Sequence, residues 1–140
     1  MNNWQDWLRD GDDNSEFVEV KKSYSDQELI TLLKNEGYSP VKRIKEGAIF
    51  FQADGSNYIL FNQQDTLQIV IMFNDAQHIE YEELNEWNSN HRFSRAYINE
   101  DNGVVVLDND LDLKAGVSEQ QIIRFIGKFQ LLAGLFKEKM

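Results

Sequence analysis

The stretch Leu84–Tyr97, with the sequence LNEWNSNHRFSRAY, marks the point where the chain changes from helix to strand. Its first half has the apolar spacing of an amphipathic helix, and its last residues alternate like the start of a strand. The stretch mixes asparagines, arginines and aromatic residues, which is too polar for a plain core and too aromatic for a plain surface. It predicts a helix-to-strand corner that divides the strands of the fold into two groups.

Five runs rich in apolar and β-branched residues predict strands, three before the corner and two after its helix. Asp54-Gly55 fits a two-residue hairpin turn, because both positions tolerate positive φ. Asn102-Gly103 ends the loop of a second hairpin. The predicted strands are Val41–Ala53, Asn57–Asn62, Thr66–Phe73, Ser94–Asn99 and Val104–Leu113.

Three amphipathic segments predict helices. A capping box starts the first at Ser25 and the last at Ser118. The middle helix spans about Ile79–His91, and its expected buried side is Tyr81, Leu84, Trp87 and His91. The element order is therefore α-β-β-β-α-β-β-α. Strands that come in runs, rather than alternating with helices, predict the α+β class, with an antiparallel sheet and helices on one face.

The strand Thr66–Phe73 is apolar on both sides. One side, which suits a core, consists of Leu67, Ile69, Ile71 and Phe73. Val70 and Met72 make the opposite side apolar as well. Such strands are typical of sheets covered on both faces. We therefore expect cover partly from helices and partly from a binding partner.

The composition indicates an acidic globular protein. The 140 residues have a formal net charge of −10, and 41% of them are hydrophobic, which suffices for a core. A field of this sign repels phosphate backbones and anionic membranes, so we expect no nucleic-acid or membrane partner. The sequence has no Cys and only two His, which excludes disulfides and thiolate zinc sites and weakens any histidine-rich metal site.

Neither a secretion signal nor an enzyme motif is visible. The first residues lack a basic segment followed by a long apolar run, and no apolar run approaches the roughly 20 residues of a membrane helix. We expect a cytoplasmic location. The chain has no Gly-rich phosphate loop, nucleophile elbow or metal-binding helix motif. We therefore expect no catalysis and no cofactor.

Residues 1–22 are expected to form an acidic arm, distinct from a domain at residues 23–140. Trp4, Trp7 and Leu8 share one face of the arm if it is helical. These side chains either dock on the body of the same chain or anchor the arm on a partner or a second protomer. The sequence leaves both arrangements open.

A recognisable pattern extends from about Tyr81 to Val117. Its residues are Asn85, Trp87, Asn88, Phe93, Arg95, Tyr97, the strand Asp108–Leu113 and Gly116-Val117. The pattern resembles the YbjN family, bacterial proteins described as sensory transduction regulators. Residues 23–75 match that family only in element order and hydrophobic pattern. The resemblance implies a fold like that of type III secretion chaperones and a regulatory or chaperone-like role, and it implies no catalytic residue.

The corner itself supplies the first candidate site. Its candidate residues are Asn85, Trp87, Asn88, Arg92, Arg95 and Tyr97. One interpretation is a structural latch, in which Trp87 is buried and the amides bond the chain where helix turns into strand. Another is a surface that binds a partner. A third is a small-ligand pocket near Trp87, Asn88, Arg92 and Tyr97.

The acidic run Asp108–Asp112 partly resembles a calcium-binding loop, but its sixth position is Leu113 where such a loop needs Gly. Leucines alternate with Asp108, Asp110 and Asp112, as they do in a strand with one solvated side. We therefore predict no metal site. The alternative function of the three aspartates is an acidic ridge along which a basic partner docks.

The last helix carries apolar and small residues beyond its core side: Ile123, Gly127, Leu131, Gly134 and Leu135. Two glycines in one helix cost about 1 kcal/mol each relative to Ala, and they permit close approach of another backbone. This surface either packs within the chain or forms the interface of a homodimer.

Overall fold

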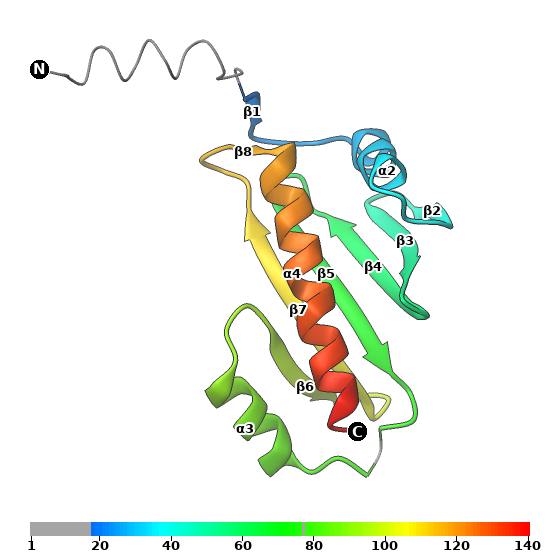
Figure 1. Ribbon diagram of the computed structural model, residues 1–140, viewed down its shortest axis with the longest axis vertical. Coiled ribbons are helices and arrows are strands. Elements are labelled where there is room, and N and C mark those ends of the chain that lie inside the picture. Colours follow the sequence, from blue (N-terminus) through cyan, green and yellow to red (C-terminus); the bar gives the residue numbers. More distant parts are fainter. Residues whose placement is uncertain (1–17, 77) are drawn as a thin grey trace, which may run out of the picture.

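The computed structural model describes residues 18–76 and 78–140, so most of the predicted arm lies outside the described residues. A six-stranded antiparallel sheet with strand order β2-β3-β4-β5-β7-β6 forms its centre (Figure 1). A short antiparallel pair, β1-β8, lies beside the start of α4. The strands are β1 (Val20–Lys21), β2 (Val41–Lys45), β3 (Ala48–Ala53), β4 (Ser56–Asn62), β5 (Thr66–Phe73), β6 (Arg95–Asn99), β7 (Val104–Asp112) and β8 (Val117–Ser118). The helices are α2 (Asp26–Asn35), α3 (Tyr81–Asn90) and α4 (Glu119–Glu138).

The predicted α+β class and the order of its helices and strand runs are confirmed. Local signals set the helix ends. At α2, the Ser25 hydroxyl accepts from the Glu28 N–H and the Glu28 carboxylate accepts from the Ser25 N–H, both at 3.0 Å. Ser118 and Gln121 make the same reciprocal pair at α4. Asp54 and Gly55 both have positive φ, as the predicted hairpin turn requires.

One predicted strand, Val41–Ala53, is in fact the hairpin β2-β3. Its turn includes Gly47, whose φ is +77°, and a Cβ at this position would lie 2.9 Å from the carbonyl oxygen of Asn62. Glycine is therefore required both by the backbone conformation and by the close approach of β4. The hairpin adds a basic edge strand, because Lys42, Arg43 and Lys45 are exposed on β2. Charged residues on an edge oppose pairing with another chain.

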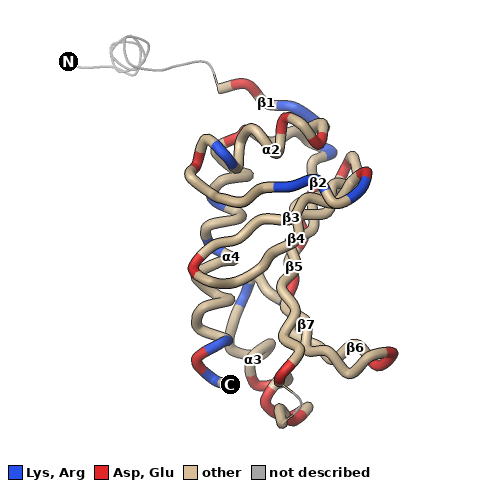
Figure 2. The backbone as a smooth tube through the Cα atoms, turned by 90° about the vertical axis from the view of Figure 1, so that its right-hand side faces the viewer, with Lys and Arg blue, Asp and Glu red and all other residues tan. Residues whose placement is uncertain are grey.

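The helices and one face of the sheet enclose the core. Leu29 and Leu33 of α2, Phe129 of α4, and Leu60 and Ile69 of the sheet are at most 1% exposed and belong to one cluster. α4 runs along the sheet on this side, and Figure 2 shows none of the described helices on the other side of the central strands. Among the described residues, no helix is both long and apolar enough to cross a membrane.

The opposite face of the sheet is also apolar. Ala48, Val70 and Val106 are buried there, at 2%, 7% and 5% exposure, but they are not part of the core cluster. We call this surface the open face, and its apolar residues are Ala48, Phe50, Ile59, Phe61, Val70, Met72 and Val106. The expected second apolar side of β5 is thus confirmed, and within the described residues no helix packs on it.

Candidate functional site

The corner between α3 and β6 is sealed by Trp87. Its indole is fully buried, packs edge-on against Phe136 of α4 at 5.0 Å between ring centroids, and stacks on His91 at 3.6 Å. The indole Nε1–H donates to the Ser94 hydroxyl at 3.0 Å, so the one polar atom of the ring is satisfied. The prediction that Tyr81 shares this buried side is wrong: Tyr81 is the first residue of α3, and it is 66% exposed.

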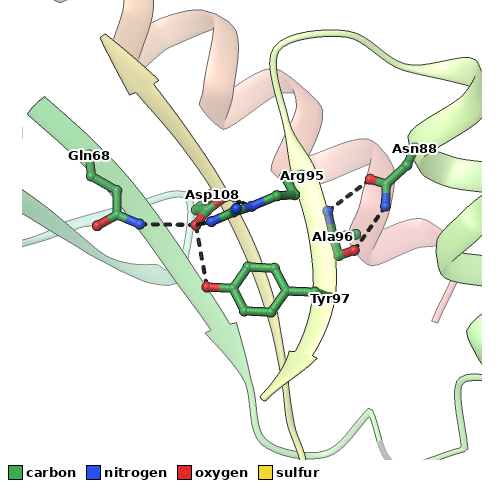
Figure 3. Close-up of polar contacts among 6 residues, drawn as sticks. All are labelled: Gln68, Asn88, Arg95, Ala96, Tyr97 and Asp108. Carbon is green, nitrogen blue, oxygen red and sulfur yellow. Dashed lines mark hydrogen bonds and ion pairs between the residues drawn. The ribbon is translucent and has the colours of Figure 1, made fainter. Parts of the chain in front are cut away.

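Asn88 attaches α3 to the edge strand β6. Its amide nitrogen donates to the Ala96 carbonyl and its amide oxygen accepts from the Ala96 N–H, each at 2.9 Å (Figure 3). The side chain therefore bonds Ala96 as a neighbouring strand would, on the side that faces away from β7. Asn85 and Arg92 are exposed and take no part in this pair.

Arg95 and Tyr97 point to the open face, where they surround a buried carboxylate. Arg95 donates to both oxygens of Asp108, at 3.1 Å from Nε and 2.8 Å from Nη2. The Tyr97 hydroxyl donates to the same carboxylate at 3.3 Å, and the Gln68 amide donates from the other side at 3.0 Å (Figure 3). Asp108 is thus held by three side chains from its two neighbouring strands, β5 and β6.

The surroundings of this cluster raise the pKa values of two of its groups, Arg95 and Tyr97. The hydrogen bond to Asp108 raises the pKa of the Arg95 guanidinium, and the negative charge of Asp108 adds to that effect. Burial raises the pKa of the Tyr97 hydroxyl, and the charge of Asp108 raises it further. Both groups therefore keep their protons around Asp108, and the cluster is a fixed arrangement of donors around one acceptor.

Asp108 does not belong to the predicted acidic ridge. Asp108 is only 2% exposed and is covered by Arg95, so it is not available to a docking partner. Asp110 and Asp112 are exposed on the same strand, β7, as predicted. Gln68 was missed by sequence analysis. Its only signal is that a polar residue stands two positions before Val70 on the apolar side of β5.

Strand register aligns the open face into one row across all six strands. Directly paired residues point to the same side of a sheet. The row consists of Lys42, Phe50, Ile59, Val70, Asp108 and Arg95. Its centre is apolar, Lys42 ends it at one edge, and the Arg95–Asp108 pair ends it at the other. Met72, 46% exposed, widens the apolar centre beside Val106.

The predicted dimer surface on α4 is exposed in this chain. Leu131 and Leu135 are 68% and 42% exposed, and Ile123 is half-buried. A Cβ added at Gly127 or Gly134 would meet no atom within 4 Å. Packing within the described residues thus does not explain these two glycines, and the dimer interface stays a prediction.

The four residues of the predicted ligand pocket do not line a common cavity. Trp87 lies in the core beneath α4, whereas Tyr97 is on the open face bonded to Asp108, and the amide of Asn88 is occupied by Ala96. A hollow of about 640 Å³ lies elsewhere, beside the start of α2, and is lined by polar residues that include Asp26 and Arg43. In residues 18–76 and 78–140, no group of three His, Asp or Glu is placed to hold a metal ion.

Among known protein families, the sequence model of one matches most of this chain. The sequence model of the YbjN family, described as "Putative bacterial sensory transduction regulator", matches residues 25–140. The chain belongs to the YbjN family. The match includes α3, the Asn88–Ala96 pair and the Arg95–Asp108 cluster, and it begins at the N-cap of α2. No curated protein and no solved structure shows significant similarity to this YbjN chain.

Proposed function

We propose that this YbjN protein is a non-enzymatic regulatory module that binds a protein partner on its open face. The proposal rests on the row of paired residues Phe50, Ile59 and Val70, at the centre of a sheet face on which no helix of residues 18–76 and 78–140 packs. Val70 is buried by its neighbours in the sheet, but Phe50 and Ile59 are half-buried and Met72 beside them is 46% exposed. Apolar surface that stays accessible in this way marks interaction sites in soluble proteins. The family description as a regulator agrees with such a role.

The charges around the open face favour a particular partner. Asp110 and Asp112 are exposed beside its apolar centre, and the whole chain has a net charge of −10. A partner segment with apolar residues for the open face and basic residues for the two aspartates is complementary in both respects. The Arg95–Asp108 cluster supports the arrangement, because it fixes β6 against β7 at the border of this surface.

Site-specific photo-crosslinking in bacterial cells tests this proposal. A photoreactive amino acid in place of Met72 is expected to form one discrete protein adduct. The matched control has the same group at Lys34, an exposed position on α2. Purified partner should then bind the wild-type chain, and Met72→Glu or Asp110→Lys should weaken it about tenfold or more, since these changes place an unpaired charge or reverse a complementary one. Equal adducts at both positions, or unchanged binding by both variants, would refute the open face as the site.

We also propose that the protein forms a homodimer through α4. The exposed Leu131 and Leu135, with the open space over Gly127 and Gly134, support this proposal. α4 lies on the other side of the sheet from the open face (Figure 2), so a dimer formed in this way leaves the partner surface accessible.

A further inference from the structure

A line of exposed residues on α4 has the spacing of a coiled-coil interface. Its residues, which we call the α4 stripe, are Arg124, Gly127, Leu131, Gly134, Leu135 and Glu138, and all six are exposed. Arg124, Gly127, Leu131, Gly134 and Glu138 follow one another at steps of three and four residues. Steps of this kind keep a line of residues on one side of a helix, so that a second helix can pack along it.

The glycines give the α4 stripe its shape. Each costs about 1 kcal/mol of helix stability relative to Ala. Neither is needed to avoid contact with the part of the chain that the structure describes, because a Cβ at either position would meet none of its atoms within 4 Å. The hollow over them is lined by Gln130, Leu131 and Leu135, and also by the acidic residues Asp54 and Glu138. A large apolar side chain from another helix would fill this hollow.

The α4 stripe is self-complementary in one orientation. Leu131 lies at its centre, Arg124 is seven residues before it, and Glu138 is seven residues after it. Two antiparallel copies related by a twofold axis at Leu131 therefore bring each Arg124 level with the Glu138 of the other copy. The same operation brings each Leu135 level with Gly127, four residues on either side of the centre. A parallel pair would instead put the two Arg124 side chains together and the two Glu138 side chains together, which repel.

We propose that two copies of this chain pack α4 against α4, antiparallel, with the twofold axis at Leu131. The inference rests on the proposed homodimer and specifies its geometry. Each interface then contains two Arg124–Glu138 ion pairs and two Leu135 side chains over Gly127. A single pair of helices buries less area than the about 1,600 Å² of a standard interface, so the dimer dissociates on dilution.

Sedimentation equilibrium of the full chain tests the arrangement through a charge swap. The wild-type chain is expected to dimerise with a concentration-dependent mass. Arg124→Glu and Glu138→Arg should each weaken the dimer about tenfold or more, because each creates two like-charge contacts per interface. The double variant Arg124→Glu/Glu138→Arg should restore it. Lys34→Glu on exposed α2 is the matched control and should leave the mass unchanged.

Each other outcome overturns a defined part of the account. A dimer that neither single variant weakens, or that the double variant does not restore, refutes the antiparallel register. The variant Leu131→Asp then tests separately whether α4 forms the dimer interface. If the variant is monomeric, α4 remains the interface. If the variant still dimerises, the interface lies on another surface. A wild-type chain that is monomeric at every concentration refutes both. In that case a probe at position 131 that quenches tryptophan fluorescence in the wild-type chain, but less in a Trp4→Phe/Trp7→Phe variant, would identify the N-terminal arm as the occupant of the α4 stripe.

Discussion

Arg95 bonds both oxygens of a carboxylate, that of Asp108, which is 2% exposed, although its own side chain is 63% exposed. The pair lies across β6 and β7, at the border of the open face. It fixes the edge strand and at the same time keeps a buried charge satisfied. Arg95 and Asp108 therefore stabilise the fold as a pair, and the effects of replacing them on the unfolding free energy should be coupled.

A double-mutant cycle measures this coupling. Arg95→Ala leaves the Asp108 carboxylate with fewer donors and should cost about 1–2 kcal/mol, the lower range for a buried charged acceptor, because water enters where the exposed guanidinium was. Once Asp108 is also replaced by Ala, the loss of Arg95 should matter little. Urea unfolding of the two single variants and the double variant should give a double-variant loss smaller than the sum of the single losses. Additive losses would show that the pair contributes nothing as a pair.

Trp87 is expected to be the largest single contributor in the corner. Trp87→Ala removes a fully buried indole that packs on Phe136, and such truncations cost about 3–5 kcal/mol. Tyr81→Ala on the same helix is the control, because Tyr81 is 66% exposed and its loss should change the unfolding free energy by less than about 0.5 kcal/mol. The two values come from chemical denaturation. Similar losses in both variants would contradict the assigned burial.

Asn88 is expected to protect an edge strand. Asn88→Ala removes both hydrogen bonds to Ala96 and should destabilise the protein by about 1–3 kcal/mol. It also frees the N–H and C=O of Ala96 for pairing with another chain, so aggregation should rise. Light scattering on heating compares this variant with Asn85→Ala, whose side chain is exposed. If Asn85→Ala aggregates as readily as Asn88→Ala, the protective role is excluded.

Asp26 should give the protein part of its acid sensitivity. Burial opposes ionisation of its carboxyl, but hydrogen bonds from the Gly47 N–H, the Asn62 amide and Arg43 outweigh that effect and lower its pKa. A lowered pKa stabilises the fold above the unfolded value of 3.8, and this contribution disappears as the pH falls through the lower folded value.

The variant Asp26→Asn isolates this effect. It should be less stable than the wild-type chain at about pH 7, and the gap should narrow as the pH falls below 3.8, because the wild-type carboxyl then takes up a proton. Urea unfolding at pH values above and below 3.8 measures the difference. A stability gap that stays constant, or that grows in acid, would show that the ionised form of Asp26 is not what the fold requires.

Local chemistry explains why much of this fold could be predicted. Capping at Ser25 and Ser118 and the Asp54-Gly55 turn depend on neighbours in sequence, so the pattern suffices to place them. The turn at Gly47 was missed, because the close approach that requires glycine comes from the carbonyl of Asn62, fifteen residues further along the chain.

The candidate site was harder to predict for the same reason. Alternation along β7 predicted an exposed aspartate at position 108, and the residue is buried because β5 and β6 place Gln68 and Arg95 around it. The pattern of one strand does not reveal how that strand is paired with its neighbours, so the burial of Asp108 could not be predicted from β7 alone. Asn88 was predicted to bond the chain after α3, and it does, since its partner Ala96 is only eight residues away.

Methyl NMR of the full chain, titrated with the partner recovered by crosslinking at Met72, shows whether that partner binds the open face. The methyl signals of Ile59, Val70 and Val106 are expected to shift or broaden, while those of the core residues Leu33 and Ile126 stay in place. Shifts confined to residues of the α4 stripe, with Ile59 and Val70 unchanged, would contradict binding at the open face.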